Sequence, residues 1–447
     1  MLSARIRDHG EVSVFHPPCG PLEGRRDGDV VRVQGVPYAH AERFERPMPV
    51  EAWTDVRVAV EPAPACPQPP NAFLDEVLGT RWGELAADEH CQRLTITLPG
   101  DLAEGERVPV MVWIHGGSYT SGAGDLAIMD PAPLVREQRV IVVAVTYRLG
   151  LFGYLASGDR PANLGLLDQL EAFRWVQRNI AAFGGDPRRV TAFGESAGGD
   201  AVAHLMTLPE APRLFARAII QSAPLGIARG RARMSEAMGQ VASAVTPTMD
   251  ADDVVALQER VAAPAKRYGL LAGMPFGTQY GHDPLPPEPL VEAAWRAVAP
   301  SIEVLVGNTA EEARLFVARV PAVKRLASLP VVGGAVQRML VALVTRIVYG
   351  RPAAVFARRH ARAGGVAHRY VISWAAPGNP YGACHTIDLP LLFGTGDTWS
   401  RAALVAGATP ASLAAAGREV RRVWGDFAHG RLAAAGAVPG ALRHWRV

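Results

Sequence analysis

A serine with a glycine two residues to either side lies near the middle of the chain, in Gly194-Glu195-Ser196-Ala197-Gly198. It directly follows the apolar run 190–193 and precedes a segment whose apolar residues have helical spacing. A serine on a sharp strand-to-helix turn needs small flanking residues, because larger side chains would clash with the neighbouring strand or helix. The pattern predicts a nucleophile elbow carrying Ser196, in preference to a glycine-rich turn without chemistry.

A second glycine-rich loop, His115-Gly116-Gly117-Ser118-Tyr119, follows the apolar run 108–114. Backbone N–H groups in such a loop can point at a developing oxyanion, and the N–H of Ala197 can add another donor. The alternative is a plain tight turn. Residues 122–127 match a dinucleotide-binding fingerprint only loosely and do not sit at the end of a strand, so the sequence predicts no nucleotide cofactor.

A serine nucleophile needs a base, and the base needs an orienting acid; after an elbow they follow in the order serine, acid, histidine. His385 occupies a glycine-containing loop just beyond the run 370–374, which is the position required of the base. Glu311 and Glu312 both follow the run 303–306, and spacing alone leaves either as the acid. Both could instead be an acidic first turn of a helix, which the helix dipole favours.

Short β-branched runs alternate with longer helical patterns along the chain. The runs that read as buried parallel strands are residues 108–114, 140–146, 190–193, 218–221, 303–306 and 370–374. The alternation predicts an α/β fold with a mostly parallel central sheet and helices on both faces. We expect one catalytic domain over residues 1–447, with helical insertions near 225–300 and 317–366 that form a lid or pocket wall.

Composition excludes several classes of function. The 447 residues carry 46 Lys plus Arg and 43 Asp plus Glu, and a net charge of +3 is too small to indicate a nucleic-acid partner. Lys266 and Lys324 are the only lysines, which excludes a phosphate-binding Gly-Lys-Ser/Thr loop and a Ser-x-x-Lys pair. The four cysteines form no Cys-x-x-Cys and no close Cys/His set, so neither a metal nor a redox pair is predicted.

The N-terminal residues contain no apolar stretch resembling a signal peptide, which predicts a cytoplasmic protein with reduced thiols. The longest apolar zone, residues 329–348, is interrupted by Gln337, Arg338 and Arg346. It falls short of the uninterrupted stretch of about 18 residues that reads as a membrane span. We expect an amphipathic helix there and no membrane span.

Taken together, these segments resemble the type B carboxylesterase and cholinesterase family, and bacterial para-nitrobenzyl esterases in particular. The resemblance extends over nearly the whole chain. It rests on Gly35-Val36-Pro37-Tyr38-Ala39, residues 163–169, Phe183-Gly184-Gly185-Asp186-Pro187, the elbow at residues 194–199, Gly382-Ala383-Cys384-His385, and Trp424 with Phe427-Ala428. It implies the α/β-hydrolase fold.

The resemblance also implies roles for individual residues. Glu312 falls where the family places its acid, which favours it over Glu311. The implied triad is Ser196 as nucleophile, Glu312 as acid and His385 as base, and the implied oxyanion-hole donors are the N–H groups of Gly117, Ser118 and Ala197. Ser118 and Ala313 replace small residues usual in the family, and because both are themselves small we expect the backbone geometry to be kept.

Other positions depart further from the family pattern. Cys66 and Cys91 match its first disulfide, but without a signal peptide we expect reduced thiols. Trp82 lies near the place where cholinesterases hold a cation-binding tryptophan, and a buried or lid tryptophan is the interpretation we favour. Glu195 is either a buried charge beside the alcohol side of the site or a structural hydrogen-bonding group.

The predicted function is therefore a cofactor-free serine carboxylesterase that acts on a small-molecule ester through an acyl-enzyme. An amidase, carbamate hydrolase or lipase with the same triad is the near alternative. A catalytically silent binding protein of the same fold is the alternative from another class, and the presence of all three triad residue types argues against it.

Overall fold

The computed structural model describes residues 12–447, except for residue 82 and residues 318–319, 321–322, 324 and 326–332. Its strands are β1 Val12–Phe15, β2 Leu22–Asp27, β3 Val30–Pro37, β4 Ala39–His40, β5 Met48–Pro49, β6 Arg57–Val58, β7 Arg93–Pro99, β8 Val108–Ile114, β9 Ile141–Val145, β10 Gly185–Glu195, β11 Arg217–Gln221, β12 Glu303–Thr309, β13 Ala367–Ile372, β14 Ala435–Val438 and β15 Leu442–Arg446.

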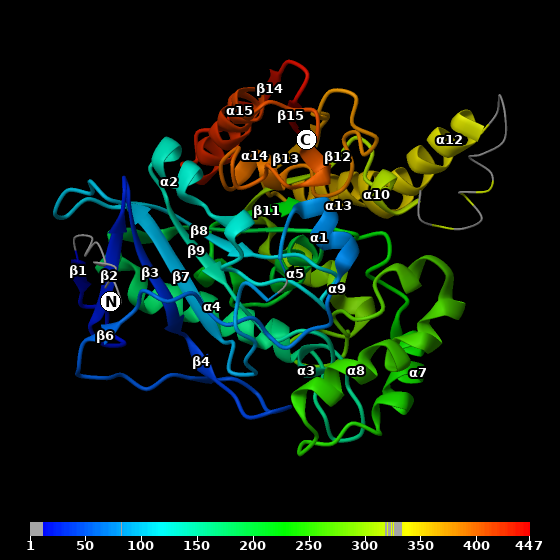
Figure 1. The fold of residues 1–447 in the computed structure, drawn as a ribbon, viewed down its shortest axis with the longest axis horizontal. Helices are drawn as coiled ribbons and strands as arrows, with labels where there is room; N and C mark the ends of the chain where they lie inside the picture. The colour runs from blue at the N-terminus through cyan, green and yellow to red at the C-terminus, as the bar shows by residue number, and fades with distance from the viewer. Residues whose placement is uncertain (1–11, 82, 318–319, 321–322, 324, 326–332) are drawn as a thin grey trace, which may run out of the picture.

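From β8 to β13, helices lie between each pair of successive strands (Figure 1). The α-helices are α1 Ala72–Leu78, α2 Ala132–Gln138, α3 Gly150–Gly153, α4 Leu164–Asn179, α5 Ala197–Leu205, α6 Ala211–Leu214, α7 Ala232–Ala242, α8 Ala251–Ala262, α9 Val291–Val298, α10 Arg314–Val317, α12 Gly333–Thr345, α13 Arg351–Arg362, α14 Leu389–Leu392 and α15 Pro410–Ala428. A π-helical turn, Arg346–Gly350, joins α12 to α13. Short 3-10 helices are Ala127–Met129, Ile180–Phe183, Ala263–Gly273, Glu288–Leu290, Ala299–Ser301 and Ala403–Val405.

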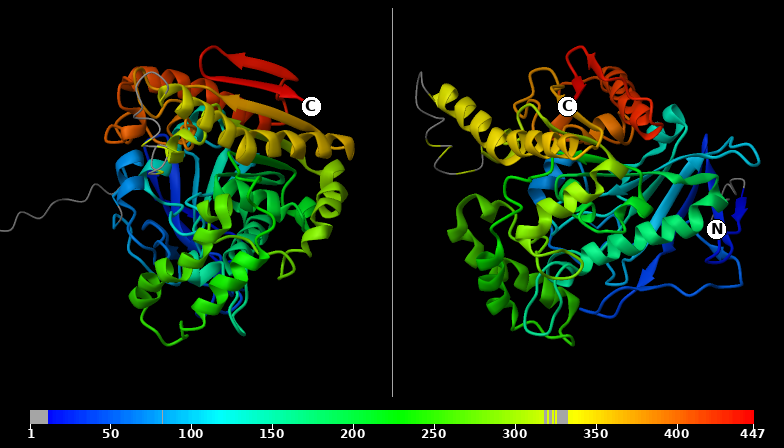
Figure 2. Two further views of the ribbon diagram at one scale, coloured as in Figure 1. Left: turned by 90° about the vertical axis from the view of Figure 1, so that its right-hand side faces the viewer. Right: turned by 180° about the vertical axis from the view of Figure 1, so that it is seen from behind.

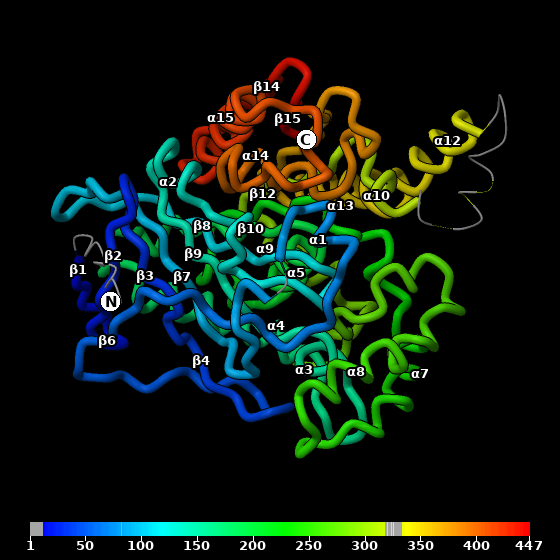
Figure 3. Tube along the Cα trace, in the orientation of Figure 1, coloured from blue at the N-terminus to red at the C-terminus, as the bar shows by residue number. Residues whose placement is uncertain are grey.

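One sheet runs through the molecule, in the order β1-β2-β3-β7-β9-β8-β10-β11-β12-β13-β15-β14. The central strands from β9 to β13 pair in parallel, whereas β1, β2, β3, β7, β14 and β15 pair antiparallel at the two ends. The tube trace shows β1 and β2 at the left of the molecule and the C-terminal hairpin of β14 and β15 at the top (Figure 3). Strands from both ends of the described chain therefore belong to the same sheet.

Each face of the sheet is covered by helices. Every residue of β8 is buried, and alternate side chains of the strand enter two different cores. Val110, Val112 and Ile114 pack in the core that contains α4, α5, α7 and α9, whereas Met111 and Trp113 pack in the core that contains α2, α14 and α15. Buried parallel strands need an apolar residue at every position, which is why these runs are recognisable in the sequence.

The two predicted insertions are largely helical. Residues 225–300 form α7, α8 and α9 with intervening 3-10 turns; α7 and α8 lie at the lower right of Figure 1, and α9 lies nearer its centre. Within residues 317–366, α12, the π turn and α13 form one long helix, in yellow (Figure 2). By length and composition alone this helix, Gly333–Arg362, is able to cross a membrane, a criterion that the core helices of many proteins also meet; 33% of its most apolar window is buried.

Candidate active site

Ser196 occupies the turn between β10 and α5. Its backbone has φ 57° and ψ −121°, a conformation that L-residues rarely adopt outside strained functional turns. The flanking glycines make room for the turn, since a Cβ on Gly198 would lie 2.0 Å from the carbonyl oxygen of Ile114 in the adjacent strand β8. The small residues that the sequence places around Ser196 are thus required by the close approach of strand and helix.

His385 connects the serine to a carboxylate. Its Nε2 lies 2.8 Å from Oγ of Ser196, and its Nδ1 lies 2.5 Å from Oε2 of Glu312. The other oxygen of Glu312 accepts a hydrogen bond of 2.7 Å from the N–H of Thr309, which fixes the carboxylate. Glu312 follows β12 and His385 follows β13, so the parallel strands deliver both groups to the same edge of the sheet as Ser196.

Glu311 and Glu312, which spacing alone left as equal candidates for the orienting acid, have different surroundings in the structure. Glu311 pairs with Arg314 at 2.9 Å and accepts a hydrogen bond from the N–H of Ala383. Glu312, in contrast, is fully buried against the imidazole. Of the two, Glu312 has the geometry of an orienting acid.

The loop after β8 lies against the serine. A Cβ added to Gly116 would be 3.1 Å from Cβ of Ser196. Gly117 has φ 111°, and a side chain there would collide with the carbonyl oxygen of Ser121 at 1.9 Å. Within the described residues, the N–H groups of Gly117, Ser118 and Ala197 donate no hydrogen bond, which leaves them available to a bound oxyanion.

A buried chain of hydrogen bonds contacts the loop after β8 through Tyr119. The sequence did not predict it. Oη of Tyr119 donates to Oδ2 of Asp200 at 2.7 Å, and Nδ1 of His204 lies 3.3 Å from the same oxygen. His204 contacts Oη of Tyr280 through Nε2 at 2.7 Å. Although burial alone would raise it, the pKa of Asp200 is lowered by His204 and by the hydrogen bond from Tyr119.

Tyr119 and Asp200 lie next to residues that the sequence does single out. Tyr119 directly follows Ser118, and both have positive φ values, 60° and 56°. Asp200 sits in the first turn of α5, where an aspartate reads as an ordinary helix-dipole partner. No spacing rule links residues 119 and 200, so only the folded structure reveals their contact.

Glu195 is a second buried carboxyl group at the site. Its Oε1 lies 3.3 Å from Nε2 of His385 and has no hydrogen-bond partner among the described residues. Burial raises the pKa of Glu195 well above its ordinary value. Burial opposes protonation of His385, but Glu195 and Glu312 outweigh it and raise the pKa of the imidazole.

A cavity of about 210 Å³ opens over Ser196 and His385. Its lining includes polar groups of the reaction, among them Glu195, Gly117 and Ser118. The lining also contains many apolar side chains, namely Phe73, Leu74, Leu78, Leu126, Met129, Leu315, Phe316 and Leu389. The described lining contains no arginine or lysine, so this cavity favours an uncharged, apolar group next to the serine.

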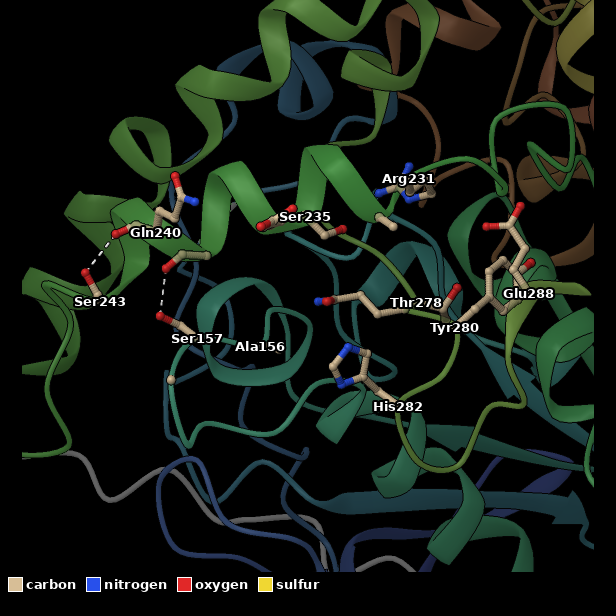
Figure 4. Close-up of a pocket in the computed structure, with 15 residues that line it drawn as sticks. Ala156, Ser157, Arg231, Ser235, Gln240, Ser243, Thr278, Tyr280, His282 and Glu288 are labelled. Carbon is tan, nitrogen blue, oxygen red and sulfur yellow. Dashed lines mark hydrogen bonds between the residues drawn. The ribbon is translucent and has the colours of Figure 1, made fainter.

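A larger cavity of about 690 Å³ lies elsewhere, between α7 and the loops at residues 156–158 and 278–288 (Figure 4). Arg231, Thr278, Tyr280 and His282 are among its polar lining residues. None of the predicted triad or oxyanion residues lines it. We assign the reaction to the smaller cavity, because Ser196 and His385 line it and do not line the larger one.

The remaining predicted features are placed as follows. Cys19, Cys66, Cys91 and Cys384 are all buried and unpaired. The N–H of Leu149 donates to Sγ of Cys66, so this thiol takes part in local packing. Trp82 lies outside the described residues. No group of three or more His, Cys, Asp or Glu within the described part of the chain could hold a metal ion.

The sheet order, the elbow and the Ser196–His385–Glu312 contacts define an α/β-hydrolase, as the sequence predicts. A family model described as "Carboxylesterase family" matches residues 11–329. The chain belongs to this family and is a serine carboxylesterase, a carboxylic ester hydrolase.

Relatives cover nearly the whole chain. A probable N-octanoylanthranilate hydrolase of Rhodococcus erythropolis, AqdA2, is 40% identical over 92% of each chain. The para-nitrobenzyl esterase of Bacillus subtilis (strain 168) is 33% identical over 86% of this chain and 83% of its own. A solved para-nitrobenzyl esterase structure aligns with a TM-score of 0.79 and 28% identity, covering 96% of this chain and 93% of its own. The resemblance to para-nitrobenzyl esterases is confirmed.

Proposed function

We propose that Ser196 is the nucleophile of ester hydrolysis, His385 its general base and acid, and Glu312 the carboxylate that orients the imidazole. Oγ of Ser196 attacks the ester carbonyl carbon while its proton passes to Nε2 of His385. The observation that carries this assignment is the unbroken hydrogen-bond sequence from Ser196 through His385 to Glu312.

The N–H groups of Gly117, Ser118 and Ala197 stabilise the negative charge that forms on the carbonyl oxygen. His385 then returns the proton to the leaving alcohol, and the acyl group remains on Ser196. A water molecule that gives its proton to His385 attacks this acyl-enzyme; His385 passes the proton to Oγ of Ser196 as the Oγ–acyl bond breaks and the carboxylic acid is released. Every proton in the cycle is handled by one imidazole, which needs no metal or cofactor.

We further propose that the preferred acyl group is an aliphatic chain of medium length. The apolar walls provided by Leu74, Leu78, Leu126 and Leu315 support this preference, because they can bury methylene groups but offer no polar partner. A charged or strongly hydrated group would lose its hydration there without replacement.

Hydrolysis of medium-chain N-acyl aryl amides is the second candidate. The relative that is 40% identical over 92% of the chain is named as an N-octanoylanthranilate hydrolase, which favours this activity. Anthranilate carries a carboxylate, whereas the described cavity lining contains no cationic side chain. We therefore place the ester first and the amide second.

A comparison of substrates tests these assignments. We would measure kcat/KM for para-nitrophenyl esters from acetyl to palmitoyl, together with N-octanoylanthranilate, using the purified protein and Ser196→Ala. The expected result is a maximum near medium chains and a loss on the order of 10⁴-fold in Ser196→Ala. A fluorophosphonate should label the protein but not the variant; unchanged turnover in Ser196→Ala would refute the mechanism.

The location predicted from the sequence is also a proposal. We propose that the protein resides in the cytoplasm, and the four unpaired cysteines support this, since reduced thiols are typical of that compartment. Fractionation of cells that express the full chain tests it: recovery of the activity outside the cytoplasmic membrane would contradict it.

A further inference from the structure

The long helix from α12 to α13 exposes an unusual number of apolar side chains. Met339, Leu343 and Ile347 follow one another at intervals of four residues and are 61%, 48% and 43% exposed. Val355 in α13 is exposed as well. Figures 1 and 2 show that the N-terminal end of α12 projects beyond the rest of the molecule. No described residue covers this row of side chains.

Arginines accompany the apolar row. Arg338 and Arg346 directly precede Met339 and Ile347, and Arg351, Arg358 and Arg362 are exposed in the next three turns. Among the described residues none of these five arginines forms an ion pair, whereas Arg359, which faces inward, pairs with Glu292. We call the nine residues the cationic face: Arg338, Met339, Leu343, Arg346, Ile347, Arg351, Val355, Arg358 and Arg362.

The charge balance of the surrounding sequence is strongly one-sided. Residues 313–387 contain no aspartate and no glutamate. The same tract contains Arg314, Arg319, Lys324, Arg325, Arg338, Arg346, Arg351, Arg358, Arg359, Arg362 and Arg369. A net charge of only +3 for the whole chain conceals this local excess, because acidic residues elsewhere compensate for it.

The cationic face is connected to the catalytic cavity. Phe316 lines the cavity, is 42% exposed and lies against the ring of His385 with a centroid distance of 5.3 Å. It belongs to α10, which packs on α12 through Val317 and Val341. The N–H of Ala313 also donates to Oγ1 of Thr345 at the end of α12. A surface that binds α12 therefore comes close to the mouth of the cavity.

From these observations we infer that the cationic face docks the enzyme on an anionic lipid surface, with the helix lying in the interface. Met339, Leu343 and Ile347 enter the boundary of the acyl chains, and the arginines contact the lipid phosphates. Long arginine side chains can extend to the headgroups while their helix lies among apolar groups. The docking positions the catalytic cavity to receive apolar esters that partition into the membrane.

Charge favours a lipid surface over the other possible occupants. Burial against a second copy would desolvate five unpaired arginines and oppose them to the same positive face. A membrane-spanning position would place Arg346 and Arg351 deep in hydrocarbon, where each is strongly unfavourable. A nucleic acid would satisfy the arginines but leave the apolar row without a partner.

Vesicle flotation tests the inference. The full chain is mixed with vesicles of phosphatidylcholine alone, or with vesicles in which about a third of the lipid is phosphatidylglycerol. We expect binding to the anionic vesicles and its loss at high salt. Replacing Arg338, Arg346, Arg351 and Arg358 by glutamine should lower the partition constant about fivefold per arginine. Met339→Ser with Leu343→Ser and Ile347→Ser should lower it at least about tenfold.

Matched controls use the same substitutions on other surfaces. Leu270→Ser with Leu290→Ser removes side chains that are 52% and 54% exposed, and Arg136→Gln with Arg178→Gln removes exposed charges. These variants should bind vesicles like the unaltered protein. All variants should keep their turnover of a dissolved short-chain ester, which shows that they are folded.

Several results would overturn the inference. One is the absence of flotation with anionic vesicles at low salt, and another is flotation that both sets of face variants leave unchanged. A third is a protein that does not bind vesicles but forms a dimer, which the apolar substitutions convert to monomer. This result would assign the cationic face to self-association. Binding of duplex DNA without binding of vesicles would assign it to nucleic acid.

Discussion

Oε1 of Glu195 lies 3.3 Å from Nε2 of His385, the same nitrogen that lies 2.8 Å from the Ser196 hydroxyl. The imidazole is thus flanked by two buried carboxyl groups, Glu312 at Nδ1 and Glu195 at Nε2. Both raise the pKa of His385 against the opposing effect of burial. The proposed general base must be neutral to accept a proton, so Glu195 influences the pH at which the enzyme becomes active.

Glu195→Gln should therefore move the acidic limb of the pH–rate profile. Protonated His385 favours the ionised form of Glu195, and this carboxylate in turn stabilises the imidazolium. Its loss lowers the pKa of His385, and the neutral base persists to lower pH. We expect the ascending limb of kcat/KM to shift downward by about one pH unit or more. Steady-state rates on a short-chain ester across the pH range measure the shift. An unmoved limb, or one displaced upward, would contradict the coupling.

Glu312→Gln should reduce kcat on the order of 10⁴-fold, because the amide cannot hold the imidazole in the required tautomer or stabilise its positive charge. Glu311→Gln is the matched control at the next position, where the carboxylate pairs with Arg314. Its kcat should change by less than about tenfold. Comparable losses in the two variants would remove the distinction between the glutamates.

Tyr119→Phe should lower kcat about tenfold while KM stays nearly constant. Ser118 and Tyr119 both have positive φ values, and the hydrogen bond from Tyr119 to Asp200 helps to hold this unfavourable backbone beside the serine. Loosening the loop misplaces the oxyanion donors, which act mainly in the transition state. Steady-state kinetics separate the two constants, and Tyr280→Phe, at the far end of the chain of hydrogen bonds, is the control. A change confined to KM would refute the positioning role.

Asp168→Asn should destabilise the fold by about 3–5 kcal/mol, because it leaves the buried guanidinium of Arg148 without its counter-charge. Both oxygens of Asp168 accept from Arg148, at 2.7 and 2.8 Å, and the two side chains are 0% and 3% exposed. Glu419→Gln, which breaks an exposed pair with Arg422, should cost less than about 1 kcal/mol. Urea midpoints of the three proteins measure both effects.

The central part of the fold is predictable from the sequence because its strands are buried on both sides. Such strands show as continuous apolar runs, and the run 190–193 lies inside β10, which extends further toward both ends. The antiparallel strands β1 to β3 and β7 were not predicted. β1 and β2 are short and partly exposed, which weakens their signal. β7 is almost fully buried, but Thr95 and Thr97 interrupt its apolar residues, so it shows no continuous apolar run. Sequence patterns thus locate the middle of the sheet better than its ends.

In the candidate site, the glycines around Ser196 are enough to predict the nucleophile from the sequence. The order serine, acid, histidine along the chain is enough to predict His385 as the base. These signals do not separate Glu311 from Glu312, because adjacent residues after a strand have nearly the same sequence context; only the family resemblance favoured Glu312. The contact of Tyr119 with Asp200 joins residues that are 81 positions apart, with no motif to announce it. Contacts of this kind depend on the packing of α5 against the loop after β8.

The serine turn is attached to β10, which pairs with β8 on one side and β11 on the other in the middle of the sheet. Separating β10 from β8 and β11 would disrupt both hydrophobic cores at once. Local unfolding around Ser196 therefore requires unfolding of the whole domain core. Heating should consequently abolish turnover and near-ultraviolet ellipticity in a single transition. Residual activity then serves as a direct gauge of the native population during purification or storage.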